Sequence, residues 1–271
     1  MTKVLVVTSG KGGVGKTTST AALGAALAIS GQKVVVIDFD VGLRNLDLVM
    51  GAERRVVFDL INVVQGEAKL AQALIRDRRM ETLSLLAASQ TRDKDALTLE
   101  GVSRVIDELR EKFDWVICDS PAGIEKGATL AMHFADSAVI VTNPEVSSVR
   151  DSDRIIGLLD SKTARAAKGE RIEKHLLLTR YDAARAARGE MLKLEDVLEI
   201  LSIPLIGIIP DSDEVLKASN IGAPVTFNSP NSAPSRAYFD AAKRLMGETI
   251  DMVVPSDKKG LMGRLFGRKV A

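Results

Sequence analysis

Cysteine is almost absent from this chain of 271 residues, in which Cys118 is the only one. A single cysteine cannot form an internal disulfide, and alone it can hold neither a structural metal nor an iron–sulfur cluster. A fold stabilised by internal disulfide bonds is therefore excluded, and the sequence indicates that the protein resides in a reducing compartment.

Aromatic residues are also scarce, at 4% of the chain, which argues against a nucleic-acid module built on stacked rings. No apolar run is long enough to span a bilayer. The first such run, residues 4–7, is too short for the core of a signal peptide. Because it leads directly into a glycine-rich loop, we interpret it as a strand.

Neither sign of charge dominates the whole chain, whose net charge is +1, but the charge is unevenly distributed. Residues 257–271 hold five of the 37 Lys and Arg residues and one of the 36 acidic residues, which gives this tail a charge of +4. The remaining 32 basic and 35 acidic residues leave the body at −3. The sequence thus predicts a mildly acidic body with a basic tail.

Short, β-branched apolar runs alternate with helical patterns. We expect strands at 3–8, 33–38, 115–119, 138–142, 175–179 and 205–209, and helices at 16–30, 99–112, 147–160, 191–201 and 235–247. Unbroken apolar strands indicate a sheet that is covered on both faces. The pattern predicts a doubly wound, three-layer α/β fold with a mostly parallel sheet.

The chain is predicted to form one folded domain over residues 1–250, followed by a linker and a basic amphipathic tail over 251–271. Residues 221–235 are rich in Pro, Asn and Ser, and we expect them to form a surface loop before the last helix.

A glycine-rich segment follows the first strand and satisfies G-x-x-x-x-G-K-[ST] in the required strand–loop–helix setting. This motif predicts that the α/β fold is of the P-loop NTPase type and that residues 1–250 form a P-loop ATPase domain. Its glycines let backbone N–H groups converge on phosphate oxygens beside the positive end of a helix. Lys16 is expected to reach the β- and γ-phosphates, and the Thr17 hydroxyl to bind Mg²⁺. The predicted phosphate-binding residues are Gly10, Lys11, Gly12, Gly13, Val14, Gly15, Lys16, Thr17 and Thr18.

Carboxylates follow two of the predicted strands, at the sheet edge where α/β folds bind ligands. Asp38 and Asp40 come after the second strand, and Asp119 ends the strand that contains Cys118. We expect Asp38 and Asp119 to hold Mg²⁺ through water, and Asp40 to orient the attacking water.

The predicted base is adenine. Guanine-binding P-loop proteins use N-K-x-D after a late strand, whereas here that strand ends with Thr179, Arg180, Tyr181 and Asp182, which lack the Asn and the Lys. Candidate contacts to the base are Arg180, Pro210 and Asp211.

We call the glycine-rich loop of residues 10–18 the phosphate cradle. Lys11 is a second cation at the mouth of this cradle, where a P-loop needs only Lys16. In a face-to-face dimer, Lys11 could reach the partner's phosphates and stabilise transition-state charge, as an arginine finger does. A solvated loop lysine is the alternative.

Residues 11–18 resemble the deviant Walker A motif of the ParA/MinD family of ATPases, and residues 38–47, 119–123 and 143–153 resemble the same family. The resemblance runs from residue 2 to the basic tail. It implies an ATP-dependent homodimer, with ATP and Mg²⁺ as cofactors, in which Lys11 acts across the dimer and Asp40 supports hydrolysis. Residues 147–151 would lie near the dimer and partner surface.

The resemblance also implies partners and a location. The dimer would bind the membrane, recruit the division inhibitor MinC and be released by MinE-stimulated hydrolysis, and it would thereby place the division septum. The protein would be cytoplasmic and reversibly peripheral on the inner face of the cell membrane, with no specific nucleic acid as a partner.

The tail itself has the pattern of a helix that lies in a bilayer interface, with an apolar sector flanked by basic residues. The predicted membrane-binding residues are Leu261, Met262, Leu265, Phe266, Arg264, Lys258 and Lys259. One tail is expected to bind anionic lipid weakly, whereas two tails in a dimer can gain roughly 10²–10⁴ in avidity.

Three other classes of protein compete with this prediction. A ParA-type ATPase that partitions DNA or other cargo would share the cradle, but it needs a basic face on the folded body, which is net acidic here. An electron carrier like the nitrogenase iron protein needs at least two cysteines per subunit, so it is excluded. A nucleotide-gated scaffold without turnover stays open.

Overall fold

The computed structural model describes residues 2–255, in which eight strands form one sheet in the order β3-β4-β2-β5-β1-β6-β7-β8. β3 (Ile75–Arg76) runs antiparallel to its neighbour β4. The seven parallel strands within 2–255 are β1 (Lys3–Thr8), β2 (Val34–Asp38), β4 (Leu83–Leu86), β5 (Trp115–Asp119), β6 (Ser137–Thr142), β7 (Glu173–Tyr181) and β8 (Leu205–Pro210).

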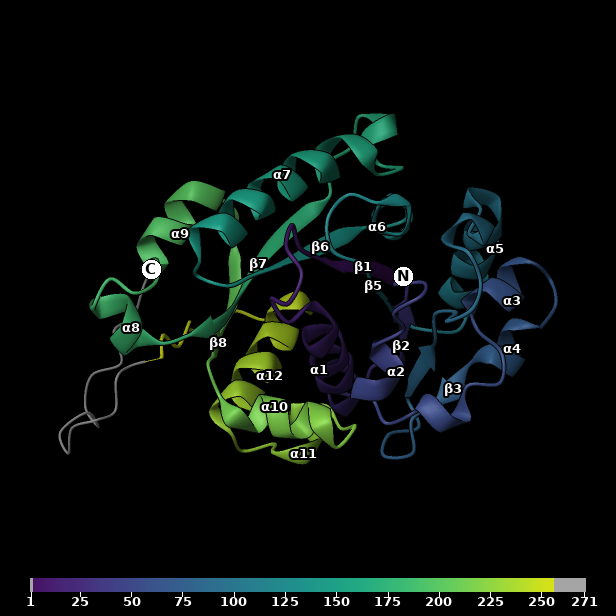
Figure 1. Cartoon of the computed structure of the whole chain (residues 1–271), viewed down its shortest axis with the longest axis horizontal. Helices are drawn as coiled ribbons and strands as arrows, with labels where there is room; N and C mark the ends of the chain where they lie inside the picture. The colour runs from purple at the N-terminus through teal and green to yellow at the C-terminus, as the bar shows by residue number, and fades with distance from the viewer. Residues whose placement is uncertain (1, 256–271) are drawn as a thin grey trace.

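Helices cover both faces of this sheet (Figure 1). They are α1 (Lys16–Ile29), α2 (Leu46–Val49), α3 (Leu60–Val64), α4 (Leu70–Ala73), α5 (Leu99–Arg110), α6 (Lys126–His133), α7 (Val146–Lys162), α8 (Ala183–Ala187), α9 (Leu194–Leu201), α10 (Asp213–Asn220), α11 (Val225–Asn228) and α12 (Ala233–Leu245). Alternate β1 side chains face opposite ways: Leu5 and Val7 pack with α1 and α12, whereas Val4 and Val6 pack with α5 and α6. The predicted three layers are present.

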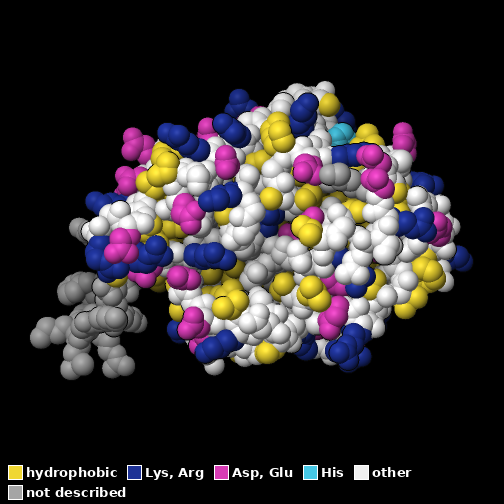
Figure 2. All heavy atoms as spheres, viewed as in Figure 1, with side chains coloured by type: hydrophobic (Ala, Val, Ile, Leu, Met, Phe, Trp, Pro, Cys, Tyr) yellow, Lys and Arg dark blue, Asp and Glu magenta, His cyan; other side chains and the backbone are white. Residues whose placement is uncertain are grey.

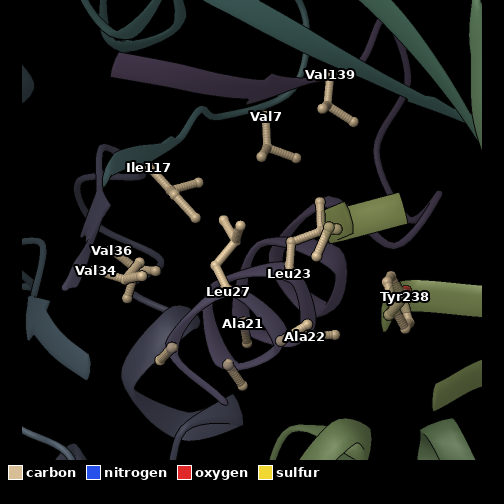
Figure 3. Packing of buried hydrophobic residues seen from close by; sticks show 14 of the residues in the cluster. Val7, Ala21, Ala22, Leu23, Leu27, Val34, Val36, Ile117, Val139 and Tyr238 are labelled. Atoms are coloured by element: carbon tan, nitrogen blue, oxygen red, sulfur yellow. The ribbon is translucent and has the colours of Figure 1, made fainter. Parts of the chain in front are cut away.

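Helix α1 lies close against the sheet because a glycine, Gly24, lies between the leucines of its buried face. Leu23 and Leu27 point toward Val7 and Ile117 (Figure 3). A Cβ at Gly24 would lie 2.8 Å from Val36 Cγ1, so glycine permits this approach. The packing fixes the N-terminus of α1, and with it the glycine-rich loop, at the carboxyl edge of the sheet.

All six predicted strands are confirmed, with ends that differ from the prediction by no more than two residues. The five predicted helices are confirmed as α1, α5, α7, α9 and α12. Residues 39–98 carried no predicted element, yet they form β3, β4 and α2 to α4. Each of these five elements has only two to five residues, too few for a periodic pattern to develop.

The prediction of a loop over residues 221–235 was wrong in part. Residues 225–228 form α11, and α12 begins at Ala233. Ser232 is the N-cap of α12 and accepts a hydrogen bond from the N–H of Ser235, and Pro234 lies in the first turn. Ser and Pro therefore mark the start of a helix here rather than a continuing loop.

The segment after α12 is held against the edge strand β8. Arg244 donates hydrogen bonds to the carbonyls of Ile206 (2.7 Å), Ile250 (3.1 Å) and Asp251 (2.8 Å). Met252 and Val254 pack against a third apolar cluster formed with β7, β8 and α9.

The predicted membrane-binding residues, Lys258 to Phe266, lie outside the described residues. Among residues 2–255, no helix combines the length and the hydropathy that crossing a membrane requires.

Candidate functional site

In the loop between β1 and α1, two backbone carbonyls accept hydrogen bonds from buried side chains, and several backbone amides have no acceptor in the described part of the chain. Ser9 Oγ donates to Lys11 O (2.7 Å), and Thr179 Oγ1 donates to Val14 O (2.7 Å). Gly15 has φ +93°, which favours glycine. Among the hydrogen bonds of residues 2–255, the N–H groups of residues 12–15 have no acceptor. Such a row of free amides at a helix N-terminus suits a phosphate.

Gly10 brings this loop against helix α7. A Cβ on Gly10 would lie 2.2 Å from the Asp151 carbonyl carbon and 2.3 Å from its oxygen. Because those atoms are backbone, a larger residue would push the loop away from α7. Gly10 is therefore needed for the packing of the loop against α7.

Lys16 is buried at the base of a hollow of about 750 Å³, which Thr17, Thr18 and Asp40 also line. Burial lowers the pKa of Lys16, while Asp119 and Asp40 oppose that effect. Of the predicted phosphate-binding residues, six line this hollow, namely Gly12, Gly13, Gly15, Lys16, Thr17 and Thr18, whereas Gly10, Lys11 and Val14 do not. The Lys16 ammonium faces two carboxylates.

Asp38 and Asp119 are paired in register at the ends of the neighbouring strands β2 and β5, and both are buried. Burial raises the pKa of Asp119 to about 6, against hydrogen bonds from Thr17 and Thr20 and the charge of Lys16. Burial, and then Asp119, raise the pKa of Asp38. The charge of Lys16 does not fully offset the cost of burying these two carboxylates. Together with the Thr17 hydroxyl, they form a set of oxygen ligands that fits Mg²⁺.

Asp38 also shapes the chain that follows it. Its carboxylate accepts hydrogen bonds from the N–H of Asp40 (2.8 Å) and of Leu46 (3.2 Å). Within residues 2–255, no three His, Cys, Asp or Glu side chains gather to hold a metal ion. A divalent cation here would therefore take further ligands from water and a phosphate, as Mg²⁺ commonly does.

Asp40 is half-buried and faces the same hollow as the free amides. Burial raises its pKa, Lys16 lowers it and Glu125 raises it again. The Asp40 carboxylate thus shares this hollow with Lys16 and Thr17, and its role toward the attacking water stays a prediction.

A second cavity, of about 450 Å³, adjoins the hollow and extends to the ends of β7 and β8. The three predicted base contacts, Arg180, Pro210 and Asp211, all line it. Arg180 adopts φ +53°, which is unusual for a residue other than glycine and is often found at functional sites.

Sequence reasoning missed two further residues of this cavity, Asn143 and Tyr238. Asn143 carries a usable signal because it directly follows strand β6, as Asp119 ends β5. Tyr238 comes from α12, and the local sequence gives no sign that its hydroxyl lies 3.0 Å from Ser19 Oγ of α1.

Lys11 lies outside its own cradle. Its ammonium donates to Glu145 Oε2 (2.9 Å) and to Ser147 Oγ (3.0 Å), at the start of α7. Of the two loop lysines, Lys16 is inside the hollow and Lys11 is at its rim.

Comparison with known proteins agrees with this geometry. The family model described as the CobQ/CobB/MinD/ParA nucleotide binding domain matches residues 5–225. The septum site-determining protein MinD of Escherichia coli (strain K12) is 60% identical over 270 residues, which cover 98% of this chain and 100% of the relative.

Solved structures of similar proteins share the fold. The MinC:MinD cell division protein complex of Aquifex aeolicus gives a TM-score of 0.82 at 42% identity, over 92% of this chain and 97% of that chain. The septum site-determining protein MinD complexed with Mg-ADP from Pyrococcus horikoshii OT3 gives 0.79 at 31% identity, over 90% and 96%. The chain belongs to the CobQ/CobB/MinD/ParA family of nucleotide-binding domains and, within it, to the MinD septum site-determining ATPases of cell division.

Proposed function

We propose that this chain works as an ATP-dependent homodimer with a Mg²⁺-dependent ATPase in each subunit. Residues 1–250 would form the ATPase domain, and residues 251–271 a linker and a tail that binds anionic lipid on the inner face of the cell membrane. The observation that carries the proposal is the pair of loop lysines: Lys16 is buried in the cradle, whereas Lys11 stands exposed at its rim.

Different residues of the cradle and of the strand ends would bind the phosphates, hold the metal ion and orient the attacking water. The free amides of residues 12–15 and the Lys16 ammonium would bind the β- and γ-phosphates. Thr17, Asp38 and Asp119 would hold Mg²⁺, which screens the phosphate charge. Asp40 would orient a water for attack on the γ-phosphorus, and the bond to the bridging oxygen would break to release ADP and phosphate.

Lys11 would leave Glu145 and neutralise charge on the partner subunit's nucleotide. An exposed ion pair contributes about 0–1 kcal/mol, so a triphosphate can displace it. The dimer would then carry two tails, and the combined avidity would attach it to the membrane.

Partners follow from the family. The Aquifex aeolicus relative forms a MinC:MinD complex, which supports MinC as a partner of this chain. MinE, implied by the resemblance described above, would stimulate hydrolysis and so release the dimer into the cytoplasm.

The test is vesicle sedimentation with ATP, ADP or no nucleotide, on the full chain and on a chain that lacks residues 257–271. We expect the full chain to sediment with anionic vesicles only with ATP, and the shortened chain to stay in solution. ATP-loaded full-length protein that remains monomeric and ignores vesicles would overturn the proposal. Phosphate release with vesicles and MinE separates an ATPase from a scaffold without turnover.

DNA or cargo partitioning of the ParA type is the alternative, and the surface gives it little support. Lys and Arg side chains intermingle with Asp and Glu over the face shown in Figure 2. The body outside 257–271 is also net acidic. DNA binding that survives removal of the tail would favour the alternative.

A further inference from the structure

A buried threonine on β7 touches the glycine-rich loop from behind. Thr179 is 4% exposed, and its hydroxyl lies 2.7 Å from Val14 O and 3.1 Å from Thr142 O. The hydroxyl has one proton, and the shorter contact is to Val14 O. These two residues are 165 positions apart in the sequence, so the contact links the loop to a distant strand.

The contact sets the orientation of one peptide plane. In a planar trans peptide, the carbonyl of one residue and the N–H of the next point in opposite directions. Because Thr179 draws the Val14 carbonyl toward β7, the N–H of Gly15 must point away from β7. Gly15 lines both the hollow and the adjoining cavity, so an N–H that points away from β7 can face a phosphate bound there.

We propose that Thr179 is a positioning residue for phosphate binding: its hydroxyl holds the Val14–Gly15 peptide in the conformation that presents the Gly15 amide. Residues 12–15 include three glycines, which have wide backbone freedom, so the loop has many alternatives to this conformation. A donor supplied by the sheet removes much of that freedom before the nucleotide arrives.

The residue after Thr179 links the contact between Thr179 and the loop to the second cavity. Arg180 follows Thr179, adopts φ +53° and lines the cavity proposed for the base. The register between β7 and β8 is irregular here, between Leu178 and Tyr181. The end of β7 therefore both positions the phosphate loop and forms part of the wall of the base cavity.

The inference rests on the phosphate cradle of the proposed function, but not on dimerisation or lipid binding. Its test therefore uses MgADP, which lacks the γ-phosphate, and needs no membrane. The full-length protein is compared with Thr179→Val, which removes the hydroxyl at nearly constant shape, and with Thr179→Ser, which keeps it. The dissociation constant is measured by titration calorimetry, and the free energy of unfolding without nucleotide by urea.

Thr142→Val is the matched control. Thr142 is also a buried threonine at the end of a strand, but its hydroxyl contacts Ser148 Oγ (2.8 Å) and Asn143 O (3.3 Å) rather than the loop. Both Val variants remove one buried hydroxyl, so we expect similar losses in the free energy of unfolding.

Binding should separate the two variants. If the presenting conformer falls to about a tenth of the population, the dissociation constant of Thr179→Val for MgADP rises about tenfold. Thr142→Val should stay within about twofold of wild type, and Thr179→Ser within about threefold, because neither loses the donor to Val14 O.

Equal affinities for Thr179→Val and Thr142→Val would overturn the proposal. If Thr179→Val does not fold, Thr179→Cys replaces it, since a thiol is a weak donor of similar size. Wild-type affinity in Thr179→Cys would then overturn the proposal. If the wild-type protein bound no MgADP, the proposed phosphate cradle would be wrong. If it failed to dimerise or to bind vesicles, the proposed function would fail but the inference about Thr179 would not.

Discussion

Lys11 and Glu145 form an ion pair across the rim of the phosphate cradle, with 2.9 Å between Nζ and Oε2 and side chains that are 40% and 55% exposed. Lys11 is the strongest factor that lowers the pKa of Glu145, through its hydrogen bond to that carboxylate. Because water screens such an exposed pair, little free energy holds the ammonium in place. A more highly charged anion could therefore take Lys11 from Glu145.

Lys11→Ala should separate nucleotide binding from dimer formation. The lysine lies outside its own cradle, so the affinity of the monomer for MgADP should change by less than about threefold. Its role across the dimer would be lost, so no dimer should form with ATP. Light scattering on a sizing column measures the oligomer. An ATP-dependent dimer of normal stability would contradict the role assigned to Lys11.

Asp40→Ala should slow hydrolysis while the nucleotide still binds. Asp40 lines the open side of the hollow, and the Asp38 carboxylate would still accept the hydrogen bond from the N–H of residue 40. Loss of a residue that orients the attacking water typically costs about 10²–10⁴ in rate. Single-turnover phosphate release measures the step, and retention on anionic vesicles should lengthen in parallel. A rate within tenfold of wild type would argue against this role.

Gly10→Ala should destabilise the folded protein without any nucleotide. The new Cβ would meet backbone atoms of Asp151 at 2.2–2.3 Å, and overpacking of this kind costs about 1–3 kcal/mol. Gly12→Ala is the control, because its Cβ would have no atom within 4 Å. Urea unfolding of the two variants measures the difference. Equal free energies of unfolding for Gly10→Ala and Gly12→Ala would contradict the prediction, because the loop would then accommodate a Cβ against α7.

The stability of the nucleotide-free protein should depend on pH through Asp119. Its folded pKa of about 6 lies above the ordinary value of 3.8, so between these values the folded state binds a proton that the unfolded state has lost. Stability therefore falls as the pH rises from about 4 to about 6.

Asp119→Asn should lack this component of the pH dependence, because an amide does not titrate. Urea unfolding at pH 4.5 and pH 7 on both proteins provides the comparison. We expect the wild type to lose more stability over that interval than Asp119→Asn. A parallel change in the two proteins would place the titration elsewhere.

The local features of this molecule could be predicted from the sequence. Strands such as β1 and β5 are buried on both faces and appear as unbroken apolar runs, and the cradle is marked by glycines and Lys16 at a fixed spacing. The carboxylates Asp38 and Asp119 were placed correctly because parallel strands end at a common sheet edge.

The contacts that complete the site could not be predicted in the same way. Glu145 meets Lys11 from 134 positions away, and Thr179 meets Val14 from 165. Such pairs depend on the order of the strands, which periodicity does not reveal. The short elements in 39–98 and the start of α12 were missed or misplaced because they are brief or because their capping residues also occur in loops.

The hydrogen bonds from Arg244 determine how the domain would transmit tension. They join the segment at Ile250 and Asp251 to Ile206 of the edge strand, and α12 carries the guanidinium. A pull on the chain beyond residue 255 would pass first into β8 and α12, while the cradle lies after β1, three strands away from that edge. Because α12 also packs on α1, and the Tyr238 hydroxyl lies 3.0 Å from Ser19 Oγ, tension at the C-terminal end of the domain would pass through α12 into the helix that begins at the nucleotide-binding loop.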